Sequence, residues 1–233
     1  MLQLRRTILT SLLATFAFAP LSGCGHQVTP DRLYDDQPGQ MVINYSVSGT
    51  LDFTNLNYVI VLNTCGVGGE PYPNGYSTTY TNYTYVFGVG ASLFQTTVAP
   101  ALFEYYLSSG SLYKLPVTLG SSTTSFNPDL NGDGTTFQLT FTRAQLNNPL
   151  QESTPCPSGG MPLAPVWYIN FFSLDGNGNV LDSLGQGGPT DTTFSLPINT
   201  AALVQHTISR PTGWTHASNP NAWITGGEII SYP

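Results

Sequence analysis

A segment near the middle of the chain has the spacing of oxygen-bearing side chains that could bind calcium. Residues 129–134 read Asp-Leu-Asn-Gly-Asp-Gly, the opening of a calcium loop, in which alternating oxygens wrap a hard cation and glycine permits a sharp turn. The twelfth place, which should supply a bidentate glutamate, is Thr140, and the flanking segments look like strands, so an EF-hand is excluded. Two interpretations stay open: a looser calcium site at Asp129, Asn131 and Asp133, or a plain hairpin turn.

Aromatic residues in two segments are the candidates for ligand binding. Tyr72 and Tyr76 flank a Pro-Asn-Gly turn and Tyr80 follows them, while Trp214 and His216 lie near the end of the chain. Tyrosine and tryptophan present rigid rings with a polar group at small cost in conformational entropy, which suits stacking on a sugar or contact with a protein. The alternative is that these rings pack in the core of the fold.

Motifs for catalysis are weak or missing in the sequence. Ser111-Leu-Tyr-Lys114 matches S-x-x-K, but that motif needs a helix start, and here a strand-like context makes a chance match the better interpretation. His206 and His216 do not have the spacing of metal ligands. A carboxylate pair brought together from distant strands would leave no local signature, so a carbohydrate-active enzyme stays as an alternative.

The elements that must position these residues are predicted to be β-strands. Residues 41–49 alternate between two faces, and 56–64 is a continuous apolar run typical of a central strand buried on both faces. Residues 166–174 form a second aromatic-led run. The other predicted strands are 80–90, 112–119, 135–142 and the weaker candidates 192–196, 203–208 and 222–231.

The fold class follows from the absence of helical periodicity. Clusters of Gly, Pro, Asn and Asp separate the strands, which favours an all-β, antiparallel β-sandwich, or a barrel-like closure of the same strands. At most one or two short helical turns are expected, one of them at residues 142–147. Residues 99–107 fit either a strand or a short helix. No shift in composition marks a second domain, so residues 41–233 are predicted to form a single β-sandwich domain.

The N-terminus has an ordered pattern of charge, apolar residues and cysteine. Arg5 and Arg6 precede the apolar stretch 8–20, which is shorter than the roughly 20 residues that span a bilayer. Leu21-Ser-Gly-Cys24 follows directly. This segment resembles the signal peptide and lipobox of bacterial lipoproteins.

The resemblance implies where the protein is located and how it is attached to a membrane. Residues 1–23 would be the signal peptide that is cut off, and Cys24 would carry acyl chains such as palmitate. The protein would then be extracytoplasmic and lipid-anchored to a bacterial membrane. Gly25 in place of aspartate favours the outer membrane or cell surface. Residues 24–40 are polar and contain two prolines, which indicates a flexible lipidated tether.

Two cysteines remain for each other once Cys24 is assigned to lipid. In an oxidising compartment Cys65 and Cys156 are expected to form a disulfide, with two free buried thiols as the alternative. The disulfide requires the runs 56–64 and 165–174 either to be antiparallel neighbours in one sheet or to face each other across two sheets.

The predicted mature chain is acidic and carries few charges. Without residues 1–23 it has four basic and thirteen acidic side chains, a formal charge of −9. The basic residues are isolated from one another, so no basic patch can neutralise phosphates and a nucleic-acid partner is excluded. Charged residues make up only 8% of the chain, so its solubility must come from uncharged polar side chains.

These features together predict a membrane-anchored extracytoplasmic binding module without enzymatic activity. Its expected ligand is an extracellular polysaccharide or an envelope protein. The alternatives are a structural component that assembles in the cell envelope and a carbohydrate-active enzyme without a readable motif. No cofactor is expected apart from the calcium alternative.

Overall fold

The described part of the chain is built from antiparallel β-strands. The computed structural model describes residues 39–66, 84–108, 111–120, 123–146, 164–185, 194–198 and 202–233. All described residues belong to one compact unit, which lies within residues 36–233. The all-β prediction is confirmed. Within the described ranges, no helix has the length and apolarity needed to cross a membrane.

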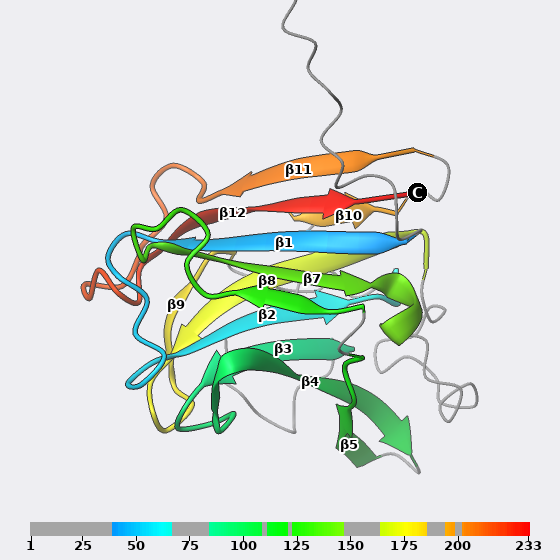
Figure 1. The fold of residues 1–233 in the computed structure, drawn as a ribbon, viewed down its shortest axis with the longest axis horizontal. Helices are drawn as coiled ribbons and strands as arrows, with labels where there is room; N and C mark the ends of the chain where they lie inside the picture. Colours follow the sequence, from blue (N-terminus) through cyan, green and yellow to red (C-terminus); the bar gives the residue numbers. More distant parts are fainter. Residues whose placement is uncertain are drawn as a thin grey trace, which may run out of the picture. The chain divides into compact units, whose positions relative to one another are not determined.

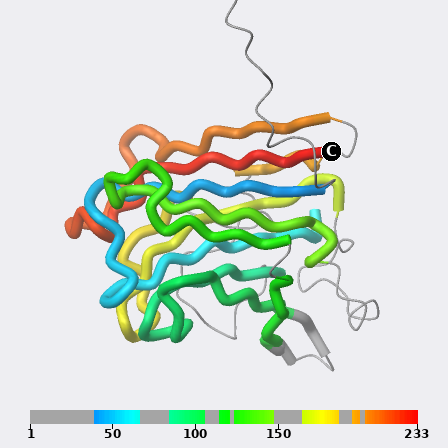
Figure 2. The backbone as a smooth tube through the Cα atoms, in the orientation of Figure 1, coloured from blue at the N-terminus to red at the C-terminus, as the bar shows by residue number. Residues whose placement is uncertain are grey.

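Five strands form the first sheet, here called sheet A (Figures 1 and 2). Its order is β11 (Val204–Ser209), β12 (Ile224–Ser231), β1 (Gln40–Val47), β7 (Thr136–Thr142) and β6 (Ser125–Asn127). β1 is central, and its pairing with β12 places Met41 opposite Ser231. Along β1 the side chains alternate between buried and half-buried positions, as the period of a strand with one covered face requires.

The remaining strands form sheet B. Its order is β10 (Ser195–Pro197), β8 (Val166–Leu174), β2 (Asn57–Asn63), β3 (Tyr85–Gly90), β4 (Thr96–Ser108) and β5 (Ser111–Val117), and β9 (Val180–Ser183) also pairs with β8. All of β2 is buried, as expected for the central strand that its apolar run predicts. β2 and β8 are antiparallel neighbours, with Asn63 opposite Tyr168.

The core between the two sheets is aromatic. The ring of Tyr45 in sheet A stacks on Phe137 at 4.9 Å between centroids and contacts Phe171 of sheet B at 5.2 Å. The Tyr45 hydroxyl donates a hydrogen bond of 3.0 Å to the Phe172 carbonyl, so its one polar atom is satisfied although the residue is fully buried. The described strands form two open sheets packed face to face. The sandwich prediction is therefore confirmed, and the barrel-like alternative is wrong for this part of the chain.

The structure differs from the sequence-based prediction at the short elements. β6 and β9 are strands that the sequence pattern does not predict. The ambiguous segment 99–107 lies in β4, and Pro100 is tolerated where the register between β3 and β4 shifts after Gly88. The predicted helical turn is present as the short 3₁₀ helix η2 (Arg143–Leu146).

The two ends of β1 carry different parts of the chain. At its start, the amide of Gly39 donates to the carbonyl of Pro233 at 2.6 Å, so the described chain begins beside its C-terminus. Beyond its other end, the amide of Gly49 donates to the carbonyl of Pro220 at 2.8 Å. The loop of residues 210–223 therefore lies at the end of the sandwich opposite Gly39 (Figure 1).

Candidate functional site

Two of the residues predicted to bind a ligand, Trp214 and His216, line one pocket. The pocket has a volume of about 230 Å³ and lies between the loop 210–223 and β9. Trp214 is half-buried, His216 is exposed, and Leu181 of β9, 40% exposed, completes an apolar wall. The structure thus brings the two predicted residues together at a surface that a ligand can reach. That they bind one stays a prediction.

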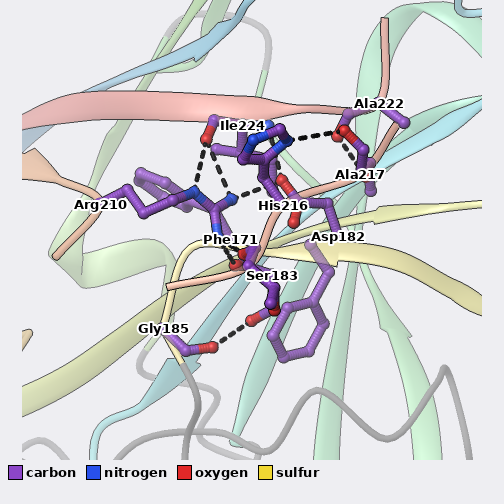
Figure 3. A network of polar contacts seen from close by, with 12 residues as sticks. Phe171, Asp182, Ser183, Gly185, Arg210, His216, Ala217, Ala222 and Ile224 are labelled. Carbon is purple, nitrogen blue, oxygen red and sulfur yellow. Dashed lines mark hydrogen bonds and ion pairs between the residues drawn. The ribbon is translucent and has the colours of Figure 1, made fainter. Parts of the chain in front are cut away.

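A buried ion pair between Arg210 and Asp182 holds the wall of this pocket (Figure 3). The two side chains are only 11% and 4% exposed. Arg210 Nη2 donates to Asp182 Oδ2, which also accepts the amide of Ile224 at 2.8 Å. The guanidinium also donates to the carbonyls of Ile224 at 3.0 Å, Ser183 at 2.9 Å and Thr215 at 2.7 Å. One side chain therefore fastens β9, β12 and the loop together.

Arg210 acts as a positioning residue because its donors are used up. A guanidinium has five N–H groups. Nε and one Nη2 hydrogen bond to Ile224, two Nη1 hydrogens bond to Ser183 and Thr215, and the remaining Nη2 hydrogen bonds to Asp182. Burial raises the pKa of Asp182, and the Ile224 amide and the Arg210 charge oppose that shift without cancelling it. The pair shapes the pocket and leaves ligand contacts to other residues.

His216 is oriented by two contacts. Its ring stacks on Trp223, with centroids 3.7 Å apart and planes 8° from parallel, and its Nδ1 lies 2.9 Å from the Ala217 carbonyl. Because a carbonyl only accepts, Nδ1 is the donor, and Nε2 has no hydrogen-bond partner among the described residues. The pocket is therefore lined by the indole of Trp214 and the imidazole of His216, groups that suit a sugar ring or a protein side chain.

The carboxylates of the calcium-like segment bind the segment's own backbone. Asp129 Oδ1 accepts the amide of Gly134 at 2.9 Å, and Asp133 Oδ1 accepts the amide and hydroxyl of Thr135 at 2.9 Å and 2.8 Å. These bonds to Thr135 lower the pKa of Asp133. The segment joins β6 to β7, so the hairpin prediction is confirmed. The ranges described contain no group of three or more His, Cys, Asp or Glu placed to hold a metal, and calcium binding stays a prediction.

The other predicted site residues have separate outcomes. Asn131 lines a groove on sheet A that is treated below. Ser111–Lys114 lies in β5, in the strand context that made S-x-x-K a chance match. Cys65 is buried and disulfide-bonded. Its predicted partner lies outside the described residues, so the pairing stays a prediction. Five more of the predicted site residues lie outside the described ranges: Cys24, Tyr72, Tyr76, Tyr80 and Cys156.

The Arg210–Asp182 pair is the part of the site that the sequence does not reveal. Asp182 follows a turn-rich segment in a strand of four residues, and 28 positions separate it from Arg210. The available signal was the rarity of basic residues, since an isolated arginine between a strand and an aromatic loop needs a partner in a chain with so few charges.

Glu104 is a buried carboxyl of β4 that lies apart from the pocket. It is 8% exposed, lies opposite Tyr85 of β3, and its Oε2 has no hydrogen-bond partner among the described residues. Burial raises the pKa of Glu104 to about 7, and the neighbouring Tyr85 hydroxyl opposes this shift only in part. The folded protein therefore favours the uncharged form of this side chain.

We expect the free energy of unfolding to fall as the pH rises from about 4.5 to about 7. In this window the unfolded chain ionises Glu104 while the folded chain keeps its proton, so the folded state binds more protons and loses stability with rising pH. Glu104→Gln removes that cost, so above pH 7 the free energy of unfolding of the variant should exceed that of the wild type by about 2–3 kcal/mol. Urea unfolding across the pH range measures the difference. A difference that did not shrink at about pH 4 would contradict this origin.

The comparisons with known proteins add no relatives to this picture. In searches of protein-family models, of curated proteins and of solved structures, nothing matches this chain.

Proposed function

We propose that this protein is a lipid-anchored, extracytoplasmic binding module without enzymatic activity. The observation that carries the proposal is the position of the pocket of Trp214 and His216, which lies at the end of the sandwich opposite Gly39. A tether that ends at Gly39 would join the domain at the end opposite this pocket and would leave the pocket uncovered. An extracellular polysaccharide or an envelope protein could then reach it.

The pocket supports a small, well-defined contact. Its volume of about 230 Å³ is below the range of about 300–1,000 Å³ that drug-sized ligands occupy, so it suits one sugar ring or one protruding side chain. The Arg210 bonds fix the loop before a ligand arrives, which reduces the entropy lost on binding. Such a site selects a ligand by shape and stacking.

The anchor in this proposal is the lipid on Cys24. Two or three acyl chains hold a protein far more firmly than one, at about 0.8 kcal/mol per buried CH₂. The domain itself is acidic and is repelled by anionic head groups, so the acyl chains must supply the attachment. A disulfide from Cys65 agrees with an oxidising compartment.

The assembly alternative receives less support from the described sheet edge. β5 is the last strand in the order of sheet B, and a long apolar edge there would favour pairing with another chain. Instead it contains Lys114 and Pro116, which both discourage edge-to-edge pairing. We therefore retain ligand binding as the function.

Two successive experiments test the anchor and the binding. Cells expressing the full chain are grown with an alkyne analogue of palmitate, and we expect the wild type, but not Cys24→Ser, to take up the label. The wild-type chain, purified in a nonionic detergent, is then applied to a glycan array with calcium and with a chelator. Trp214→Ala is expected to weaken binding about tenfold, because stacking on an aromatic ring contributes about 1 kcal/mol or more.

The matched control is Thr118→Ala, an exposed threonine at the end of β5 and outside the pocket. It should bind as the wild type does. Label on Cys24→Ser would overturn the anchor. An array without signal, together with no captured envelope protein, would overturn the binding function.

A further inference from the structure

A row of polar side chains crosses all five strands of sheet A on the face away from the core. The strand registers place Asn127 opposite Gln138, Gln138 opposite Asn44, Asn44 opposite Glu228, and Glu228 opposite Thr207. Four strand spacings of about 4.8 Å give the row a length of about 19 Å. No segment of the sequence shows this row, because each strand contributes one residue.

Hydrogen bonds within the row fix its side chains. Gln138 Nε2 donates to Asn44 Oδ1 at 2.9 Å, and Asn44 Nδ2 donates to Glu228 Oε2 at 3.0 Å. Gln205, a diagonal neighbour on β11, donates to Glu228 Oε1. Each amide still has a second N–H, and the carbonyl oxygens of Gln138 and Gln205 have no hydrogen-bond partner among the described residues. The row is thus ordered beforehand and retains unused donors and acceptors.

The row lies beside a groove. The groove has a volume of about 620 Å³, within the range of ligand sites, and is open along the sheet. Asn44, Ser46 and Thr207 line it from the sheet, Gly226 adds no side chain, and Asn131 borders it from the loop between β6 and β7. Most of the lining groups are hydroxyls, amides and backbone, and the Glu228 carboxylate and the apolar side chains of Leu130 and Ile208 complete the lining.

We propose that this groove binds a linear, uncharged polysaccharide that lies across the strands of sheet A. The inference rests on the proposed binding function and names a second site and a ligand class for it. Planar amide and carboxylate groups hydrogen-bond to the neighbouring hydroxyls of sugars, and about 19 Å accommodates several sugar rings in succession.

Charge selects this occupant over acidic polymers. Glu228 is the one charged side chain among the described residues that line the groove. Its carboxylate accepts hydroxyl protons from a neutral sugar and repels uronate, sulfate or phosphate groups. A folded protein partner would be expected to need a broad apolar centre, and among the described residues that line the groove only Leu130 and Ile208 are large apolar side chains.

Native affinity electrophoresis of the full chain in nonionic detergent tests the inference. The gels contain galactomannan, mixed-linkage β-glucan, hydroxyethylcellulose or dextran, and polygalacturonate is the acidic comparison. We expect retardation by at least one neutral polymer and none by polygalacturonate. Thr207→Trp blocks the groove at an exposed strand position, and Asn44→Thr with Gln138→Val removes two amides while keeping good strand residues. Each change should weaken binding at least about tenfold.

The matched control is Thr118→Trp, the same substitution at an exposed threonine outside the groove, which should bind like the wild type. Thermal unfolding confirms that each variant is folded. Equal retardation of wild type and Thr207→Trp would overturn the groove. If Trp214→Ala then abolished retardation, the proposed function would stand without the groove. Retardation by none of the neutral polymers, or stronger retardation by polygalacturonate, would also overturn the inference.

Discussion

Arg210→Met is expected to lower the free energy of unfolding by about 3–5 kcal/mol at neutral pH. The substitution leaves the Asp182 carboxylate buried, 4% exposed, without its counter-charge. The carbonyls of Ser183, Thr215 and Ile224 lose their donors at the same time. Urea unfolding measures the loss, and ligand binding at the Trp214 pocket should fall with it because Thr215 is released.

Arg143→Met is the control for removing a partly buried arginine. Arg143 donates to Ser231 Oγ and to the Tyr232 carbonyl, both at 2.7 Å. Because both partners are uncharged, Arg143→Met leaves no buried charge unpaired and should lower the free energy of unfolding by only about 1–2 kcal/mol. Adding Asp182→Asn to Arg210→Met should restore part of the stability, because the unpaired charge is gone. A double variant less stable than Arg210→Met would show that the charge was not the cause.

The pH dependence of Arg210→Met has a definite sign. Burial already raises the pKa of Asp182, and loss of the arginine removes one of the influences that lower it. A carboxyl whose pKa is raised in the folded state keeps its proton to a higher pH than the same group in the unfolded chain. The stability of the variant is then greatest in acid and is lost as the pH rises through that pKa. The deficit relative to the wild type should therefore shrink in acid.

The sequence predicts the long strands well because their information is local. β8 spans the predicted residues 166–174, and the burial of all of β2 follows from one continuous apolar run. β6 and β9, of three and four residues, are strands mainly because neighbours pair with them. Asp182 in β9 illustrates the limit, since only its distant partner makes its burial tolerable.

The residues of the candidate sites also differ in how far the sequence predicts them. Trp214 and His216 stand out in a sequence because few residue types make such contacts. The row through Asn44, Gln138 and Glu228 does not, because polar residues face solvent on many strands of such a sandwich. Only the register of strands up to 184 positions apart aligns these side chains. Register is fixed by the whole core and by no single segment.

Loss of the predicted Cys65–Cys156 disulfide should lower the free energy of unfolding by about 4–5 kcal/mol, because it would release a loop of about 90 residues in the unfolded chain. The sheet places residue 164, eight positions after Cys156 in the sequence, beside the residue that precedes Cys65. β2 and β8 are antiparallel neighbours, and the Ala164 amide donates to the Thr64 carbonyl at 2.8 Å, directly before Cys65. A bridge there would fasten the two central strands of sheet B at one end.

Pairing of these two cysteines makes a prediction that a generic loss of packing does not. Cys65→Ala, Cys156→Ala and the double variant should all be destabilised equally, because each removes the same bond. Reduction of the wild type should reproduce that loss and leave the double variant unchanged. Urea unfolding with and without reductant measures both effects, and thiol titration of the unreduced wild type should find neither cysteine free. Additive losses, or a Cys156 thiol that reacts in the unreduced protein, would show that Cys65 has a different partner.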